Sequence, residues 1–207
     1  MIFSTHEKIV KTEGLHFYFG FTIFLLIFQA YIKKHFPEYK SKIPALYIKD
    51  PDPFPEIEEF IQESVKNYNL ELVVIEASMK EALAQFLASR PKIKAMIMGT
   101  RESDPNCNGQ GPFAPTDGDW PKLMRINPVL FWHYKDIWTF IRNLSVPYPD
   151  LYDKGYTSLG GQNNTKPNPH LAYTDENGKP AFKPAYELTD GDLGRAGRQN
   201  GSNKSKL

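Results

Sequence analysis

Short apolar runs alternate with amphipathic stretches through the first half of the chain. Residues 44–48, 70–75 and 93–98 are apolar runs of the length expected for buried strands. Residues 56–68 and 79–89 lie between these runs and are predicted to be helices. Strands that alternate with helices imply right-handed crossovers and a parallel sheet. The pattern therefore predicts an α/β fold with a doubly wound, mostly parallel sheet.

The second half of the chain has a less regular pattern. Residues 136–144 repeat apolar positions at helical spacing, and 185–188 could add a strand. Residues 106–119 are rich in Gly, Pro, Asn and Asp and are expected to be irregular and mobile. From residue 172 the chain is polar, so we expect an irregular C-terminal tail that is disordered over 199–207.

The N-terminal part carries an apolar run over residues 15–32 that has no formally charged residue. Its length is at the lower edge of a membrane-spanning helix, which needs about 17–25 residues. A signal peptide fits less well because no small-residue cleavage pattern follows. A third possibility is a buried helix from about 21 to 36, with Leu25 and Ile32 toward the sheet and cations at its C-terminal end. We favour this helix over a membrane span.

Composition narrows the class of protein. The chain has 207 residues and a net charge of +1, which fits one α/β domain with a tail and argues against generic nucleic-acid binding. Its one cysteine, Cys107, excludes an intramolecular disulfide framework and fits a reducing compartment, so we expect a cytoplasmic protein. We also expect a monomer. Cys107 could be a nucleophile, but a bystander thiol is favoured because no histidine lies near it in sequence.

Candidate ligand residues follow two of the predicted strands. In open α/β sheets, ligands bind beyond the carboxyl ends of the strands. Gly99 ends the run at 93–98, and Arg101 and Asp104 follow it as candidates to hold an anion and a cation. Asp50 follows the run at 44–48, either as an acid at a helix entrance or near a ligand.

Two further features stand in the second half. Arg195 and Arg198 form either a solvated basic turn or a pair that grips phosphates. Trp132 and Trp138 are interpreted as core residues, because large aromatic side chains contribute chiefly through the area that they bury.

Four motifs carry a resemblance to a known family. They are Gly-Thr-Arg-x-x-Asp-Pro at 99–105, Tyr-Thr-Ser-Leu-Gly at 156–160, Pro-Asn-Pro-His-Leu at 167–171 and Arg-Ala-Gly-Arg at 195–198. Their order and spacing resemble the eukaryotic FAD synthetases (FMN adenylyltransferases). These enzymes share the adenine nucleotide alpha hydrolase-like fold of PAPS reductases and other PP-loop ATP pyrophosphatases. The resemblance covers most of the chain, from about residue 43 to residue 198.

The resemblance implies transfer of AMP from ATP to FMN, giving FAD and pyrophosphate, with Mg²⁺ as cofactor and ATP and FMN as substrates. It implies catalytic roles for Asp104, Arg195 and Arg198, with Arg101 as a further phosphate clamp and Asp104 orienting a substrate or a metal-bound water. No residue is assigned as a metal ligand. The implied substrate-binding residues lie near the adenine base, in the strand-end loop and in the FMN pocket: Ile48, Lys49, Asp50, Gly99, Arg101, Tyr156, Thr157, Ser158, Leu159, Gly160, Asn168 and His170.

The resemblance also implies four parts for the chain. These are an atypical apolar segment at 1–22, the FMN adenylyltransferase domain at 23–171, a segment at 172–198 that folds over the active site, and the tail at 199–207.

One element of the family is missing. Members carry a Ser-Gly-Gly-Lys-Asp-type PP-loop before the helix that 25–31 resembles, and residues 1–22 contain neither the paired Gly nor the Lys-Asp. Either the chain begins with a different or misread segment, or it is a degenerate, catalytically weak paralogue that binds flavin or nucleotide. A PAPS reductase is the nearest rival, but it needs a thiol on a C-terminal tail and no cysteine follows Cys107. A membrane-tethered module is a rival of another class.

Overall fold

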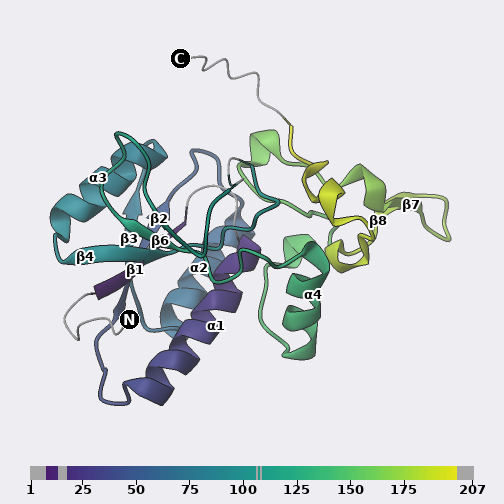
Figure 1. Cartoon of the computed structure of the whole chain (residues 1–207). Coiled ribbons are helices and arrows are strands. Elements are labelled where there is room, and N and C mark those ends of the chain that lie inside the picture. The colour runs from purple at the N-terminus through teal and green to yellow at the C-terminus, as the bar shows by residue number, and fades with distance from the viewer. Residues whose placement is uncertain (1–7, 14–17, 106, 108, 200–207) are drawn as a thin grey trace.

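The computed structural model describes residues 8–13, 18–105, 107 and 109–199. A six-stranded sheet has the order β3-β2-β1-β4-β6-β5, and its first four neighbouring pairs are parallel while β5 pairs antiparallel with β6 (Figure 1). The predicted doubly wound, mostly parallel α/β fold is confirmed. The strands are β1 Lys8–Glu13, β2 Ile43–Ile48, β3 Leu70–Ile75, β4 Ile93–Ile97, β5 Phe113–Pro115 and β6 Met124–Ile126.

Four helices flank the sheet: α1 Tyr18–His35, α2 Pro55–Asn67, α3 Met79–Ser89 and α4 Tyr134–Asn143. Alternate residues of β2 point to opposite faces, as the pleat of a strand requires. Leu46 and Ile48 share a core with α3, whereas Ala45 and Tyr47 lie in the cores that contain α1 and α2. The helices therefore cover both faces, with α3 opposite α1 and α2 (Figure 1).

Local signals explain where two of the helices begin. Ser78 and Glu81 form a reciprocal capping box at the start of α3, which satisfies backbone N–H groups that have no partner within the helix. The N–H of His133 donates to Asp136 at 2.9 Å, so α4 begins two residues before the expected range of 136–144. Asp136 is therefore not the first residue of the helix; it lies in the first turn, and its carboxylate caps the N-terminus.

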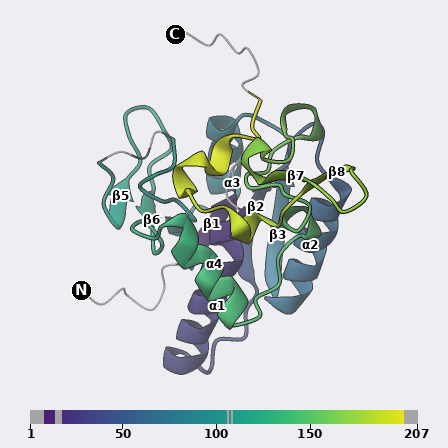
Figure 2. The ribbon, with the colours of Figure 1, turned by 90° about the vertical axis from the view of Figure 1, so that its right-hand side faces the viewer.

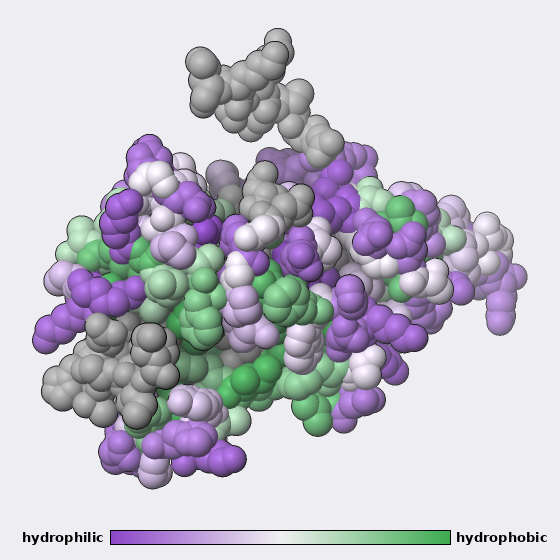
Figure 3. Space-filling model, viewed as in Figure 1, coloured by the Kyte–Doolittle hydropathy of each residue, from purple (hydrophilic) through white to green (hydrophobic). Residues whose placement is uncertain are grey.

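The described part of the apolar N-terminal run, from residue 18, lies in α1. Leu25 is fully buried, Ile32 packs beside it, and Lys33, Lys34 and His35 stand in the last turn, as the buried-helix interpretation expects. Hydrophobic residues show on the surface over this helix in Figure 3, and Tyr31 is among those exposed. In the part of the chain that the structure describes, no helix has both the length and the apolar character needed to cross a membrane.

Three elements differ from the sequence-based expectations. The strand β1 was not expected: three of its six residues are charged, whereas a central parallel strand usually reads as a continuous apolar run. The region 106–119 is not wholly irregular, because it contains β5, which pairs with β6 further along the chain. The strand expected at 185–188 is wrong, since Ala185–Glu187 is a 3₁₀ turn that follows Pro184. The tail at 200–207 lies outside the described residues, as do residues 1–7 and 14–17 of the N-terminal segment.

The C-terminal part is built from short turns. The 3₁₀ turns are Asp150–Tyr152, Gln162–Asn164, Pro169–Leu171, Ala185–Glu187 and Gly191–Arg195, and a hairpin of β7 Ala172–Thr174 and β8 Pro180–Phe182 projects from the molecule (Figures 1 and 2). The turn Gly191–Arg195 packs beside α4. This arrangement brings the segment Gly191–Arg195 back against the α/β domain, next to the loop that follows β4.

Candidate functional site

The site lies where the strand order of the sheet reverses. The strand β1 has β2 on one side and β4 on the other, and ligands of open α/β sheets bind beyond the carboxyl ends of strands at such a point. A pocket of about 230 Å³ opens there, at the loop that follows β4. It brings together seven of the residues predicted from sequence: Gly99, Arg101, Asp104, Thr157, Ser158, Leu159 and Arg195.

Asp104 holds the loop that carries it. Only 5% of this residue is exposed, and its two carboxylate oxygens accept from the backbone N–H and the guanidinium of Arg101, at 2.8 and 3.0 Å. Hydrogen bonds between charged partners are among the strong ones. The structure thus gives Asp104 a contact that sequence reasoning missed, in which it orients Arg101. The expected contact with a substrate or a metal-bound water stays a prediction.

Arg195 brings a second guanidinium to the same pocket from the C-terminal segment. Its burial lowers the pKa of Arg195, the negative charge of Asp104 raises it, and the positive charge of Arg101 lowers it. Arginine still keeps its proton in proteins. The pocket therefore holds two cations, Arg101 and Arg195, and two carboxylates, Asp104 and Asp192. Guanidinium groups match the oxygens of phosphates and carboxylates, so Arg101 and Arg195 suit an anionic ligand.

Arg198 lies nearby but is not among the residues that line this pocket. Its guanidinium packs directly against Gly160, where any Cβ would overlap it. Its backbone forms an antiparallel bridge with Thr165, and the N–H of Gln199 donates to the carbonyl of Asn164 at 2.9 Å. The Arg198 guanidinium therefore lies against Gly160, the last residue of the turn at 156–160, and the middle residues of that turn line the pocket.

The residues expected near adenine lie outside the pocket, and one of them, Asp50, lies next to Gly161, just after the turn at 156–160. Ile48 is buried in the core around α3, and Lys49 pairs with Glu58 at 3.5 Å. Asp50 contacts Gly161, since a Cβ there would lie 2.5 Å from its Oδ1. None of Ile48, Lys49 and Asp50 lines the pocket at the β4 loop.

Four of the residues expected in the FMN pocket do not line it either: Tyr156, Gly160, Asn168 and His170. Tyr156 packs edge-on against Phe54, with ring centroids 5.4 Å apart, and His170 is exposed. Asn168 is fully buried, and its amide donates to Thr157 and to the carbonyl of Leu193. Only the middle residues of the turn at 156–160 therefore line the pocket. Asn168 holds this turn through its hydrogen bond to Thr157.

A larger cleft of about 890 Å³ adjoins the pocket and was missed by sequence reasoning. It lies between α4 and residues 186–192, and both hollows share Arg101, Ser103, Tyr134, Gly191 and Asp192 in their linings. Tyr134 donates to the carbonyl of Ala185 at 2.8 Å, and burial raises the pKa of Tyr134, so this phenol stays protonated.

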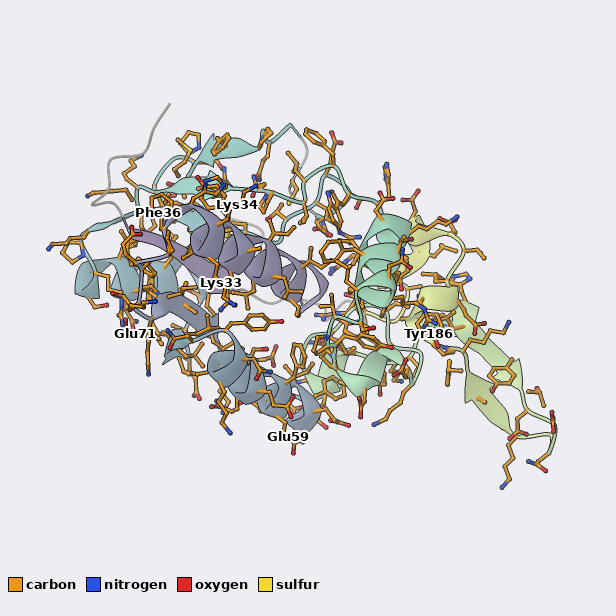
Figure 4. All side chains as sticks on the ribbon, turned by 90° about the horizontal axis from the view of Figure 1, so that it is seen from below. Lys33, Lys34, Phe36, Glu59, Glu71 and Tyr186 are labelled. Carbon is orange, nitrogen blue, oxygen red and sulfur yellow. The ribbon has the colours of Figure 1, made fainter. Side chains whose placement is uncertain are left out.

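Aromatic and cationic side chains line this cleft. Tyr186 is labelled in Figure 4. Trp138 packs edge-on against Tyr186, and the guanidinium of Arg142 lies 4.0 Å from the centre of the Tyr186 ring. Tyr134, Trp138 and Arg142 recur every four residues along α4 and so share one face. That spacing was the available signal, but it was not considered, and Trp138 was interpreted as a core residue.

Cys107 has the character of a bystander. The residue is 8% exposed, and burial followed by the negative charge of Asp104 raises the pKa of its thiol. A catalytic cysteine requires the opposite shift, toward the thiolate.

Comparisons with known proteins agree with this geometry. Residues 24–167 match the family model of the phosphoadenosine phosphosulfate reductase domain. The Schizosaccharomyces pombe protein described as "Probable FAD synthase" is 41% identical over 182 residues, which are 86% of this chain and 67% of the relative. The flavin adenine dinucleotide synthase of Saccharomyces cerevisiae is 34% identical over 72% of this chain and 50% of its own length. The chain thus spans two thirds of one relative and half of the other.

Solved structures give the same result. The crystal structure of Candida glabrata FMN adenylyltransferase in complex with FMN and the ATP analogue AMPCPP matches with a TM-score of 0.84 and 27% identity, over 92% of this chain and 81% of that one. A PAPS reductase from Candida auris, at 18% identity and a TM-score of 0.55 over 78% of this chain and 85% of that one, shares the fold alone.

Proposed function

The chain belongs to the family of the phosphoadenosine phosphosulfate reductase domain, and from this premise we propose that it is an FAD synthase. The reaction transfers AMP from ATP to the phosphate of FMN and releases pyrophosphate. Relatives with this name and solved FMN adenylyltransferases support the proposal. The observation that carries it is the meeting of Arg101 and Arg195 beside Asp104 at the carboxyl edge of the sheet.

The chemistry asks the protein mainly to position charges. An oxygen of the FMN phosphate attacks the α-phosphorus of ATP, and the bond from that phosphorus to the bridging oxygen breaks as pyrophosphate leaves in line. Negative charge grows on the leaving group, and fixed cations stabilise it most where water is excluded. Arg101, fixed by Asp104, and Arg195 would supply this stabilisation, with Arg198 seated close by on Gly160.

We place the flavin ring in the larger cleft. Its aromatic lining by Trp138 and Tyr186 suits a flat ring, and its volume of about 890 Å³ lies within the range usual for small-molecule sites. The phosphate of FMN would then reach the smaller pocket through the shared residues of the two linings, beside Thr157 and Ser158.

ATP enters this proposal as its magnesium complex. Among the described residues, no group of three or more His, Cys, Asp or Glu side chains could hold a metal. Mg²⁺ usually keeps several waters and binds through substrate phosphates with one or two carboxylates. Asp192, which lines both hollows, is the carboxylate best placed to assist. We further propose a cytoplasmic monomer.

The test is formation of FAD from FMN, ATP and Mg²⁺. Arg195→Ala should lower kcat by about 10²–10³-fold, the usual cost of one preorganised charge-stabilising donor. Asp104→Ala and Arg198→Ala should lower it as well. Arg90→Ala is the control, because Arg90 pairs with Glu71 at the amino ends of the strands, away from both hollows. Unchanged turnover in all three variants would contradict the assigned roles.

A second candidate function is a binding protein without turnover. It is favoured by one observation, the lack of a paired Gly and a Lys-Asp in the first 22 residues. Binding of FMN by the purified chain with no FAD formed at saturating ATP and Mg²⁺ would select this candidate over the enzyme.

A further inference from the structure

Asn168 joins three segments that are far apart in sequence. Its side-chain amide donates to Thr157 Oγ1 at 2.8 Å and to the carbonyl of Leu193 at 2.9 Å, and its Oδ1 accepts from the N–H of His170 at 3.0 Å. Its own backbone N–H donates to the carbonyl of Gly155 at 2.8 Å. The residue is fully buried, with no exposed surface.

These contacts leave the Asn168 amide with no donor for a ligand. A carboxamide has two N–H donors, and both are used within the protein. Asn168 also lines neither the pocket nor the cleft. It therefore serves the site through its partners, not by touching substrate.

The partners of Asn168 carry the walls of the small pocket. Thr157 lines the pocket on one side, and Leu193 is followed directly by Gly194 and Arg195, which line it on another. We infer that Asn168 is a positioning residue, which fixes the C-terminal segment to the turn at 156–160 so that the Arg195 guanidinium faces the bound phosphates. The catalytic part of this inference rests on the proposed FAD synthase function.

Other contacts fix the far end of the same segment. The N–H of Lys166 donates to the carbonyl of Gly197 at 2.9 Å, and Gly197 approaches Lys166 so closely that a Cβ would collide with that backbone. Asn168 acts at the near end, through Leu193. The segment is thus held at both ends of the stretch that contains Arg195.

The substitution Asn168→Asp removes the hydrogen bond to the Leu193 carbonyl and can keep the other two side-chain contacts. The aspartate can still accept from His170 N–H, and the Thr157 hydroxyl can rotate to donate to it. It cannot donate to the Leu193 carbonyl, so two acceptors would face each other. Asn168→Ala removes all three side-chain contacts. Asn177→Ala is the matched control, because Asn177 is exposed at the tip of the β7–β8 hairpin.

The first readout is a double-mutant cycle on FAD formation. Asn168→Asp should lower kcat by about 10–100-fold, since a misplacement of about 1 Å can cost about 10²-fold, while the KM for FMN changes less than threefold. In an Arg195→Ala background, the same substitution should cost less than threefold, because the group that it positions is already gone. An undiminished effect in that background would overturn the inference, as would wild-type kcat in Asn168→Asp.

The second readout does not depend on activity. Amide hydrogen exchange of residues 191–199 should speed up at least tenfold in Asn168→Asp and stay unchanged in Asn177→Ala, while α2 and α3 keep their protection. Exchange that is unchanged in Asn168→Asp, or raised equally throughout the chain, would overturn the inference. If the wild-type chain forms no FAD, the proposed function fails and this readout still decides the role of Asn168.

A third variant covers failure of Asn168→Asp to fold. Thr157→Val keeps the shape of the side chain but removes the acceptor that Asn168 uses. It should raise exchange over 191–199 by at least threefold, and Thr157→Ser, which keeps the hydroxyl, should not. Equal exchange in the two Thr157 variants would count against the inference.

Discussion

Each arginine at the site is placed by a different neighbour. Arg101 is held by the carboxylate of Asp104, and Arg198 lies on the bare backbone of Gly160. Arg195 is half-buried, and the charges of Asp104 and Arg101 in the loop after β4 both act on it. A guanidinium has a long, flexible stem, so its geometry is set by what it packs against. Substitutions of these neighbours should therefore affect the site as much as substitutions of the arginines.

Gly160→Ala tests this at Arg198. The new methyl group would overlap the guanidinium, and the side chain can move away more readily than backbone can, so Arg198 should leave its seat. We expect turnover to fall at least tenfold, while the free energy of unfolding falls by about 1–3 kcal/mol, the usual cost of overpacking. Steady-state kinetics and urea unfolding measure the two effects. Gly111→Ala is the control, because a Cβ there makes only ordinary contacts; equal kinetics in both variants would contradict the prediction.

Cys107 offers a test of local electrostatics. Burial and the charge of Asp104 raise the pKa of its thiol, so the thiolate fraction at pH 8 should be below that of a free cysteine. The folded protein should react with iodoacetamide at least tenfold more slowly than the protein unfolded in urea, as followed by mass spectrometry. Because the pKa is raised, the rate should keep rising as the pH passes 9. A rate equal to that of the unfolded chain at pH 8 would show an accessible, activated thiol.

At the scale of elements, sequence patterns predicted those that depend on local signals. The strand at 70–75 and the helix at 79–89 lie where the pattern placed them, because apolar spacing and the Ser78 cap coincide there. The strand β1 was missed, since its charged residues hide its central place in the sheet. At 185–188 the apolar residues serve packing against α4 and not a strand.

In the candidate site, too, sequence reasoning predicted the residues that belong to local motifs and missed those that tertiary packing brings together. The loop at 99–105 and Arg195 were predicted from motifs, and the structure brings them together. The larger cleft was not predicted, because its two walls are α4 and residues 186–192, whose approach depends on tertiary packing alone. Trp138 illustrates the difficulty: it is nearly buried, as expected of a core residue, and it also lines the cleft.

The connection between β1 and α1 is the element on which activity should depend most. The central strand β1 ends at Glu13 and α1 begins at Tyr18, and the resemblance to the FAD synthetases implies a PP-loop before this helix. Replacing residues 14–17 with Ser-Gly-Gly-Lys-Asp should raise the rate of FAD formation at least 10²-fold, since backbone amides and a lysine would then contact the leaving pyrophosphate. A Ser-Val-Val-Lys-Asp replacement is the control, because β-branched residues resist the loop conformation. Equal rates for the two loops would exclude phosphate binding there.

At the scale of the whole molecule, the net charge of +1 does not describe how side chains are distributed between the two hollows. Both hollows lie toward the C-terminal segment, which Figures 1 and 2 show wrapped against α4. The small pocket is lined by the guanidinium groups of Arg101 and Arg195, whereas the larger cleft adds the aromatic rings of Trp138 and Tyr186. The two hollows share five lining residues, which is the arrangement that the proposed phosphate and flavin sites require.

Flavin binding tests that arrangement in the intact chain. FMN fluorescence should be quenched on titration with protein, because the ring would stack or pack against Trp138 and Tyr186 in the larger cleft. Tyr186→Ala should weaken binding about tenfold, which corresponds to roughly 1.4 kcal/mol, since the half-buried ring is lost along with its contact to Arg142. Tyr173→Ala, on the exposed hairpin, is the matched control and should bind FMN as the wild type does. Unchanged fluorescence at saturating protein with a folded circular dichroism spectrum would exclude the flavin site. Equal weakening by the two tyrosine variants would instead move the ring from the cleft to the hairpin side.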